Sequence, residues 1–208
     1  VIGRDMRQSG PALRAAMIAA IADAGCEVID IGECSTPMTY WAVNVLAADA
    51  AIMITASHNP PLYNRYKVYW SDGAQVLPPH DKGIIHEVEA IVDLASVKSA
   101  PATTPLITYL GDQVEQAYFT ETLGIQCRKE QNQAHGKELQ IVYTSLHGTG
   151  ITMVPKLLEL WGFSNYQLVA TQCIPDGDFP TAKSPNPEET EAMRLGTTQL
   201  AQVRGDIL

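Results

Sequence analysis

The chain has 208 residues, of which 46% are hydrophobic and 18% are charged, a composition typical of a globular protein and not of a disordered one. Its formal net charge is −9, and the sequence contains no Lys/Arg-rich cluster, which excludes a broad electrostatic interface with nucleic acid. No apolar run reaches the roughly 20 residues that cross a bilayer, and the first residues lack the pattern of a signal peptide. We therefore expect a soluble, cytoplasmic protein without nucleic-acid or membrane partners, and its oligomeric state stays open.

Cysteine spacing gives no metal or redox motif. The four cysteines lie far apart in the sequence and include no CxxC pair. They are Cys26, Cys34, Cys127 and Cys173. The sequence allows two disulfides, but reduced thiols agree better with the expected cytosolic location.

The first half of the chain alternates helical patterns with short apolar runs. Ser9-Gly10-Pro11 is typical of a helix start, and apolar residues then recur at helical spacing until Gly25 ends the helix. Residues 50–54 are continuously apolar, as expected of a strand buried on both faces. Further strands are predicted at 26–31, 66–70 and 74–77, with a turn at 71–73, and further helices at 36–47 and 80–97.

The second half repeats this alternation after a loop-like stretch at 98–105. Helices are predicted at 109–123, 151–161 and 188–203, strands at 139–144 and 166–171, and irregular chain at 128–137 and 173–187. The alternation predicts an α/β fold made of layered α/β/α domains with mixed, mostly parallel sheets. We place the domain boundary near residue 108, between a first domain, residues 1–108, and a second, residues 109–208. Both ends have the pattern of interrupted strands, so we interpret the chain as a fragment of a larger multidomain protein.

The segment Thr55-Ala-Ser-His-Asn-Pro60 directly follows the buried strand at 50–54. Loops at the carboxyl ends of central strands are where α/β proteins place reactive groups. The Ser57 hydroxyl can accept a phosphoryl group, and His58 can exchange a proton near neutral pH. Lys67, ten residues beyond the serine, supplies a compact cation for a phosphate. From composition alone, Ser-His-Asn-Pro favours an ordinary turn over a reactive segment, and a Ser–His–acid hydrolase is disfavoured further because no Gly-x-Ser-x-Gly elbow surrounds Ser57.

The stretch from Thr55 to Trp70 resembles the active-serine signature of the α-D-phosphohexomutases, the phosphoglucomutases and phosphomannomutases. Gly3-Arg-Asp-Met-Arg7 is similar to a second segment of that family. Three more stretches are similar to the phosphoglucomutase 2-like subgroup and its bacterial relatives: 73–83, 144–150 and 179–189. The resemblance therefore extends over nearly the whole chain.

The resemblance implies a role for each candidate residue. Ser57 would carry the phosphate, with His58 and Lys67 taking part in phosphoryl transfer and proton movement. Asn59 would bind the phosphate of the substrate. Arg4 and Arg7 would do the same, or would be ordinary surface charges.

The implied reaction interconverts a hexose 1-phosphate and a hexose 6-phosphate, of glucose or mannose, through a phosphoserine and a bisphosphorylated sugar. The implied cofactor is Mg²⁺, held by the phosphate on Ser57 and by three aspartates of an acidic loop. The chain contains no Asp-x-Asp-x-Asp pattern, so we expect those aspartates beyond Leu208 and no activity from this fragment alone.

Two other functions stay open: a catalytically impaired relative that binds sugar phosphates, and a pentose-phosphate mutase or bisphosphate synthase. The first is raised by Arg65, which stands where the family usually has glycine; the arginine can be neutral, add a phosphate contact or block the pocket. His147-Gly-Thr-Gly150 is compatible with an anion-binding turn and, more simply, with a structural turn.

Overall fold

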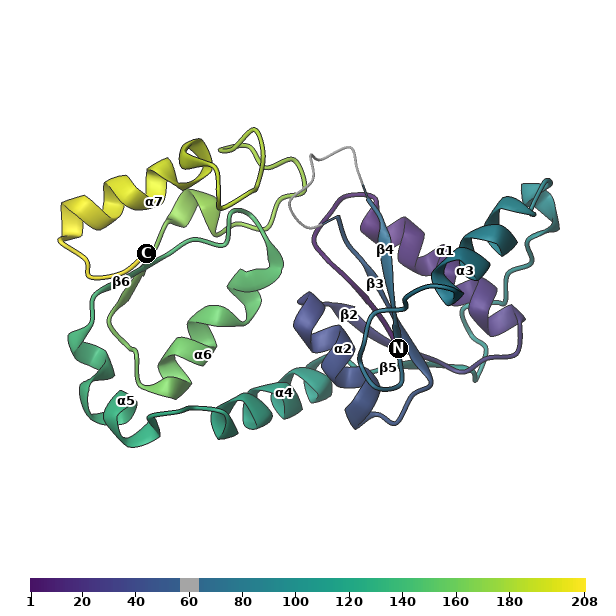
Figure 1. Ribbon diagram of the computed structural model, residues 1–208, viewed down its shortest axis with the longest axis horizontal. Helices are drawn as coiled ribbons and strands as arrows, with labels where there is room; N and C mark the ends of the chain where they lie inside the picture. The colour runs from purple at the N-terminus through teal and green to yellow at the C-terminus, as the bar shows by residue number, and fades with distance from the viewer. Residues whose placement is uncertain (57–63) are drawn as a thin grey trace. The chain divides into compact units, whose positions relative to one another are not determined.

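The computed structural model describes residues 1–56 and 64–208, which form two compact units (Figure 1). Unit 1 consists of Val1–Asp5, Ser9–Thr55 and Arg65–Glu115. The described part of unit 2 consists of Met6–Gln8, Ala56, Asn64 and Gln116–Leu208. Among the helices of these described residues, none combines the length and apolar character needed to cross a membrane.

Unit 1 contains a five-stranded sheet in the order β4-β3-β1-β2-β5. Its strands are β1 (Ile2–Arg4), β2 (Val28–Glu33), β3 (Ala50–Ile54), β4 (Tyr66–Trp70) and β5 (Ile107–Tyr109). All neighbours pair in parallel except β3 and β4, which are antiparallel. This confirms the predicted α/β fold with a mixed, mostly parallel sheet.

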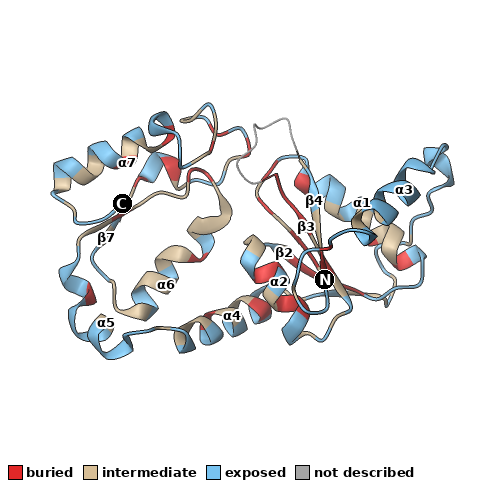
Figure 2. Ribbon diagram, in the orientation of Figure 1, coloured by how far each residue is buried: buried red, intermediate tan, exposed pale blue. Residues whose placement is uncertain are grey.

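The two helices α1 (Gly10–Asp23) and α2 (Thr36–Val45) cover opposite faces of this sheet. From central β1 the chain crosses to β2 on one side and then from β2 to β3 on the other, and right-handed crossovers in opposite directions place their helices on opposite faces. The α1 face holds a cluster of buried apolar side chains: Ile2, Ile18, Ala22, Val28 and Ile54. Burial is concentrated in these strands, whereas α3 (His80–Glu89) has no buried residue (Figure 2).

The α2 face is packed closely around Gly3. A Cβ atom on Gly3 would lie 2.6 Å from the Sγ of Cys34 and 2.7 Å from the Oγ1 of Thr39, so only glycine allows α2 to approach β1 this closely. Thr39 is fully buried and its hydroxyl lies 3.2 Å from the sulfur of Met53, on β3. Residues of β3 therefore alternate between the two cores, with Met53 facing α2 and Ile54 facing α1.

Unit 2 contains a two-stranded parallel sheet of β6 (Ile141–Tyr143) and β7 (Tyr166–Leu168). Ile207 adds an isolated parallel bridge to Ile141, in agreement with the strand pattern predicted there. The helices from residue 112 onward are α4 (Asp112–Gly124), α5 (Lys129–His135), α6 (Val154–Trp161) and α7 (Thr190–Val203). Short 3-10 turns occupy Leu94–Ser96, Gly136–Glu138, Thr149–Thr152 and Ala170–Gln172.

Four sequence predictions were wrong in detail. The predicted strand at 74–77 is reduced to one bridge, between Tyr69 and Gln75, because the prolines that follow at 78 and 79 cannot donate backbone hydrogen bonds. The helix predicted at 80–97 ends at Glu89, and Asp93 then caps a separate 3-10 turn.

The other two errors lie near the change from unit 1 to unit 2. Tyr109, predicted to begin a helix, is the last residue of β5 and pairs with Asp30. The stretch 128–137, predicted as irregular, contains α5. All four cysteines are free, in agreement with the prediction of reduced thiols.

Candidate functional site

The candidate site lies at the edge of the unit 1 sheet where the parallel strands end. The carboxyl ends of β1, β2 and β3 meet at this edge, and antiparallel β4 begins there. The residues that the chain brings together are Arg4 at the end of β1, Asp5 directly after it, Glu33 at the end of β2, Thr55 after β3 and Arg65 before β4. This is the part of an open α/β sheet where ligands bind.

Three of the predicted site residues, Ser57, His58 and Asn59, lie outside the described residues. The chain on either side of them is described. The backbone N–H of Thr55 donates to the carbonyl oxygen of Arg65 at 2.9 Å, which extends the β3–β4 ladder by one hydrogen bond. The described chain on both sides of these residues therefore lies at the edge that holds the other candidates.

Thr55 and Asp5 form a buried pair beside that hydrogen bond. The Thr55 hydroxyl donates to Oδ2 of Asp5 at 2.8 Å, and the two residues are only 4% and 6% exposed. The backbone N–H of Asp5 donates to the carbonyl oxygen of Ile54 at 3.0 Å. Together these bonds fix the end of β3 against the end of β1. Sequence reasoning did not single out either residue, because a threonine and an aspartate 50 residues apart give no local signal.

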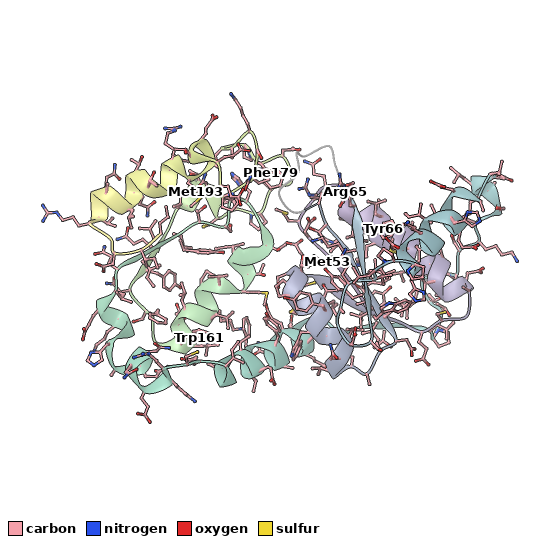
Figure 3. All side chains as sticks on the ribbon, viewed as in Figure 1. Met53, Arg65, Tyr66, Trp161, Phe179 and Met193 are labelled. Atoms are coloured by element: carbon pink, nitrogen blue, oxygen red, sulfur yellow. The ribbon has the colours of Figure 1, made fainter. Side chains whose placement is uncertain are left out.

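Lys67 is the second residue of β4 and is half-buried. It pairs with Met53, and directly opposed residues of an antiparallel pair point to the same face, so Lys67 lies on the α2 face. Tyr69, two residues on, contacts Tyr40 of α2 with ring centroids 5.7 Å apart, which agrees with this assignment. Met53, Arg65 and Tyr66 mark this part of the sheet in Figure 3.

The two arginines predicted to bind phosphate have different surroundings. Arg4 is paired with its cross-strand neighbour Glu33, with Nη1 2.9 Å from Oε2, and also donates to the carbonyl oxygen of Asp5 at 2.7 Å. Arg7 belongs to unit 2, is 1% exposed, and places its guanidinium over the ring of Phe179, 5.2 Å from the centroid (Figure 3). Because Arg4 is already paired with Glu33, an anion bound at Arg4 would share the guanidinium with the Glu33 carboxylate.

Arg65 has an ordinary backbone conformation. The described residues other than glycine with positive φ are Ala47, Leu146, His147, Phe179 and Arg204. Arg65 is not among them, so its position does not require glycine's left-handed conformation. Its side chain is exposed at the start of β4.

His147 is the centre of a buried polar network in unit 2. Its Nδ1 lies 2.9 Å from the carbonyl oxygen of Ile174, an acceptor only, so Nδ1 carries the proton. Nε2 then accepts from the Thr181 hydroxyl at 2.8 Å, whose oxygen accepts in turn from Gln172. The Gln172 carboxamide also accepts from Thr144 and donates to the carbonyl oxygen of Ala192.

The glycine-rich turn that follows His147 is internally bonded. The N–H of Gly148 donates to the carbonyl oxygen of Ser145 at 2.8 Å, and that of His147 to Gln172 at 2.7 Å. These donors hold the turn and the 172–181 segment together, which favours the structural interpretation of His147-Gly-Thr-Gly150 over the anion-binding one.

The described residues do not by themselves form a site for Mg²⁺. They contain no group of three or more His, Cys, Asp or Glu side chains that could hold a metal ion. At the sheet edge, the carboxylates of Asp5 and Glu33 are engaged by Thr55 and Arg4. Mg²⁺ requires about six oxygen ligands, which this part of the chain does not supply.

Family models match both halves of the chain. The model described as phosphoglucomutase/phosphomannomutase, alpha/beta/alpha domain I, matches residues 1–94, and the domain II model of the same family matches residues 116–208. The chain therefore belongs to the phosphoglucomutase/phosphomannomutase family. This confirms the resemblance found in the serine segment.

Individual relatives agree with the family assignment. A probable phosphoribomutase of Schizosaccharomyces pombe is 35% identical over 175 residues, which are 79% of this chain and 28% of that protein. A phosphoglucomutase of Staphylococcus epidermidis is 37% identical over 177 residues, 84% of this chain and 32% of that protein. A solved phosphoglucomutase/phosphomannomutase family protein of Burkholderia thailandensis shares the fold, with a TM-score of 0.73 and 24% identity over 99% of this chain and 42% of that chain. The chain thus spans less than half the length of each relative.

Proposed function

We propose that this chain is the part of a phosphohexomutase that carries the phosphoserine, and that the whole protein interconverts hexose 1-phosphates and hexose 6-phosphates of glucose or mannose. The observation that supports the proposal is the resemblance of residues 55–70 to the family's serine signature. Within this segment, the backbone of Thr55 is hydrogen-bonded to that of Arg65 at the carboxyl edge of the sheet. That edge of an open α/β sheet is where ligands bind, which supports a reacting serine two residues beyond Thr55.

In the proposed reaction Ser57 begins with a phosphoryl group. A hydroxyl oxygen of the sugar monophosphate attacks the phosphorus and gives its proton to neutral His58, while the bond to the Ser57 oxygen breaks and that oxygen takes a proton from the Lys67 ammonium; the return transfer reverses these proton movements. The resulting sugar bisphosphate then reorients within the site. The Ser57 hydroxyl then attacks the other phosphoryl group and takes it from the sugar. The sugar is released as the product monophosphate.

The cations at the edge have a defined task in this scheme. Phosphoryl transfer depends mainly on in-line positioning and on positive charge beside the equatorial oxygens. Lys67 on β4 provides a compact ammonium close to the start of that strand. We propose that Arg4, Arg7 and Asn59 bind the substrate's phosphate, with Arg4 exchanging part of its contact to Glu33 for the anion.

Mg²⁺ is the proposed cofactor and would neutralise charge on the transferring phosphate. We propose that the phosphate on Ser57 is one of its ligands. We further propose a cytoplasmic location, no nucleic-acid or membrane partner, and a domain boundary near residue 108, which falls between the two family matches.

One observation favours a second substrate class. The relative from S. pombe bears the name phosphoribomutase, so a pentose phosphate is the alternative substrate. The alternative of an impaired, purely binding protein rested partly on Arg65, and the ordinary backbone angle at that residue removes strain as a reason for impairment.

The test is steady-state kinetics of the full natural polypeptide with glucose 1-phosphate, mannose 1-phosphate and ribose 1-phosphate. Ser57→Ala should abolish turnover through kcat, because alanine cannot hold a phosphoryl group. Ser71→Ala, which changes an exposed serine in the turn after β4, is the matched control and should keep wild-type kinetics. Near-normal turnover in Ser57→Ala would refute the proposal.

A further inference from the structure

We propose that Thr55 and Asp5 are positioning residues for phosphoryl transfer at Ser57. The inference rests on the proposed function, because it assigns a task relative to that serine. It goes beyond that function in naming two residues, one at the end of each of two neighbouring strands, to which neither the family resemblance nor the proposed chemistry assigns a role.

Two hydrogen bonds of Thr55 run in different directions. Its backbone N–H donates to the carbonyl oxygen of Arg65 at 2.9 Å, and its hydroxyl donates to Oδ2 of Asp5 at 2.8 Å. The first bond joins the two ends of the serine segment, and the second joins that segment to the end of β1. All three residues belong to unit 1, so these bonds are internal to one compact body.

The bond between the two side chains is strong for physical reasons. Its acceptor is a carboxylate, and hydrogen bonds to ionised acceptors are roughly twice as strong as neutral ones. Thr55 and Asp5 are 4% and 6% exposed, so water competes little for either group. The backbone bond from Asp5 to Ile54 at 3.0 Å fixes the acceptor itself on the sheet.

Chain connectivity transmits this restraint to the nucleophile. Residues two apart cannot have Cα atoms separated by more than about 7 Å, whatever the conformation between them. Ser57 is two residues beyond Thr55. A rotation of the Thr55 backbone would therefore displace the reacting oxygen, and displacement by about 1 Å can cost on the order of 10²-fold in rate.

A positioning role predicts a specific kinetic signature. Thr55→Val removes the hydroxyl while keeping the shape, so kcat should fall about 10- to 100-fold with KM changed less than about threefold. Thr55→Ser restores the donor and should return kcat to within about threefold of the wild type. Substrate affinity is retained because the cations that bind phosphate are untouched.

Thr39→Val is the matched control. Thr39 is also a fully buried threonine of unit 1, and its hydroxyl contacts the sulfur atoms of Cys34 and Met53 on the α2 side of the sheet. This variant removes a buried threonine hydroxyl of unit 1 that does not contact Asp5, so it should lower the unfolding midpoint and leave kcat unchanged. Loss of kcat in both variants would show that general destabilisation, and not positioning, is responsible.

Kinetics and thermal unfolding of these variants are measured on the full natural polypeptide, beside the wild type and Ser57→Ala. The inference is overturned if folded Thr55→Val keeps kcat within about threefold, or if Thr55→Ser fails to restore it. Should Thr55→Val not fold, Asp5→Asn replaces it, because the amide keeps shape and acceptor but lacks the charge; an unchanged kcat there overturns the inference too. Absence of turnover in the wild type would instead refute the proposed function.

Discussion

Among single residues, two basic side chains lie near the start of β4: Arg65 just before the strand and Lys67 as its second residue. Lys67 was identified from the serine signature, and its register opposite Met53 places it on the α2 face. Arg65 departs from the usual glycine of the family, which raised the possibility of strain. Its φ is ordinary, so the departure is tolerated by the backbone. Only a structure gives this information, because sequence does not report φ.

Lys67→Ala should lower kcat by on the order of 10²–10³-fold, because it removes a fixed charge from the reacting phosphate. Lys67→Arg should restore activity only in part, since a planar guanidinium does not replace a compact ammonium. Steady-state kinetics are the measurement, with Lys82→Ala, an exposed lysine of α3, as the control. Full activity in Lys67→Ala would remove this lysine from the mechanism.

At the scale of elements, the strands that were predicted well are those with strong local patterns. Residues 50–54 and 66–70 form strands with the predicted bounds, because a continuous apolar run and an aromatic, β-branched run are each distinctive. β5 was missed because it has three residues, and α5 because it has no apolar stripe. The network around His147 was not predicted, since its partner Thr181 is 34 residues away.

The His147 network should be structural and costly to remove. His147→Ala removes the donor to the Ile174 carbonyl and the acceptor of the Thr181 hydroxyl and opens a cavity, so the free energy of unfolding of unit 2 should fall by about 3 kcal/mol. His135→Ala is the control: that exposed histidine contacts Glu138 in an exposed pair and should change stability by less than about 0.5 kcal/mol. Urea denaturation distinguishes the two, and equal stabilities would contradict the assignment.

Cys34, between β2 and α2, should make stability fall at alkaline pH. Burial is the main cause that raises the pKa of its thiol from 9.0 to about 11, partly offset by its contact with Thr39. The folded state therefore keeps the proton where the unfolded state loses it, so the stabilisation is complete below pH 9 and is lost as pH rises toward 11. The loss should be about 1.4 kcal/mol for each pH unit in this window.

Urea denaturation at a series of pH values tests this prediction against Cys34→Ala. The variant lacks the thiol, so its free energy of unfolding should decline less steeply than that of the wild type between pH 9 and pH 11. The tyrosines are common to both proteins and cancel in the comparison. Parallel curves would show that the thiol does not titrate differently in the folded and unfolded states.

At the scale of the whole molecule, the chain combines two units that correspond to the first two domains of one enzyme family. The family and the class of fold were predictable from sequence, because the serine signature and the alternation of helices and strands are local patterns. The pairing of Asp5 with Thr55 was not, since it depends on β1 and β3 being neighbours in the sheet. Sugar preference was not predictable, because relatives of similar identity bear the names phosphoribomutase and phosphoglucomutase.

The proposed mechanism depends on Ser57 carrying the transferred phosphate. The most direct measurement is peptide mapping by mass spectrometry after the full natural polypeptide has been incubated with glucose 1,6-bisphosphate and Mg²⁺. We expect one phosphoryl group, located on Ser57. It should be transferred to the sugar when excess glucose 1-phosphate is added, and it should be absent from Ser57→Ala. A phosphate on another residue, or mutase turnover without any phosphate on Ser57, would contradict it.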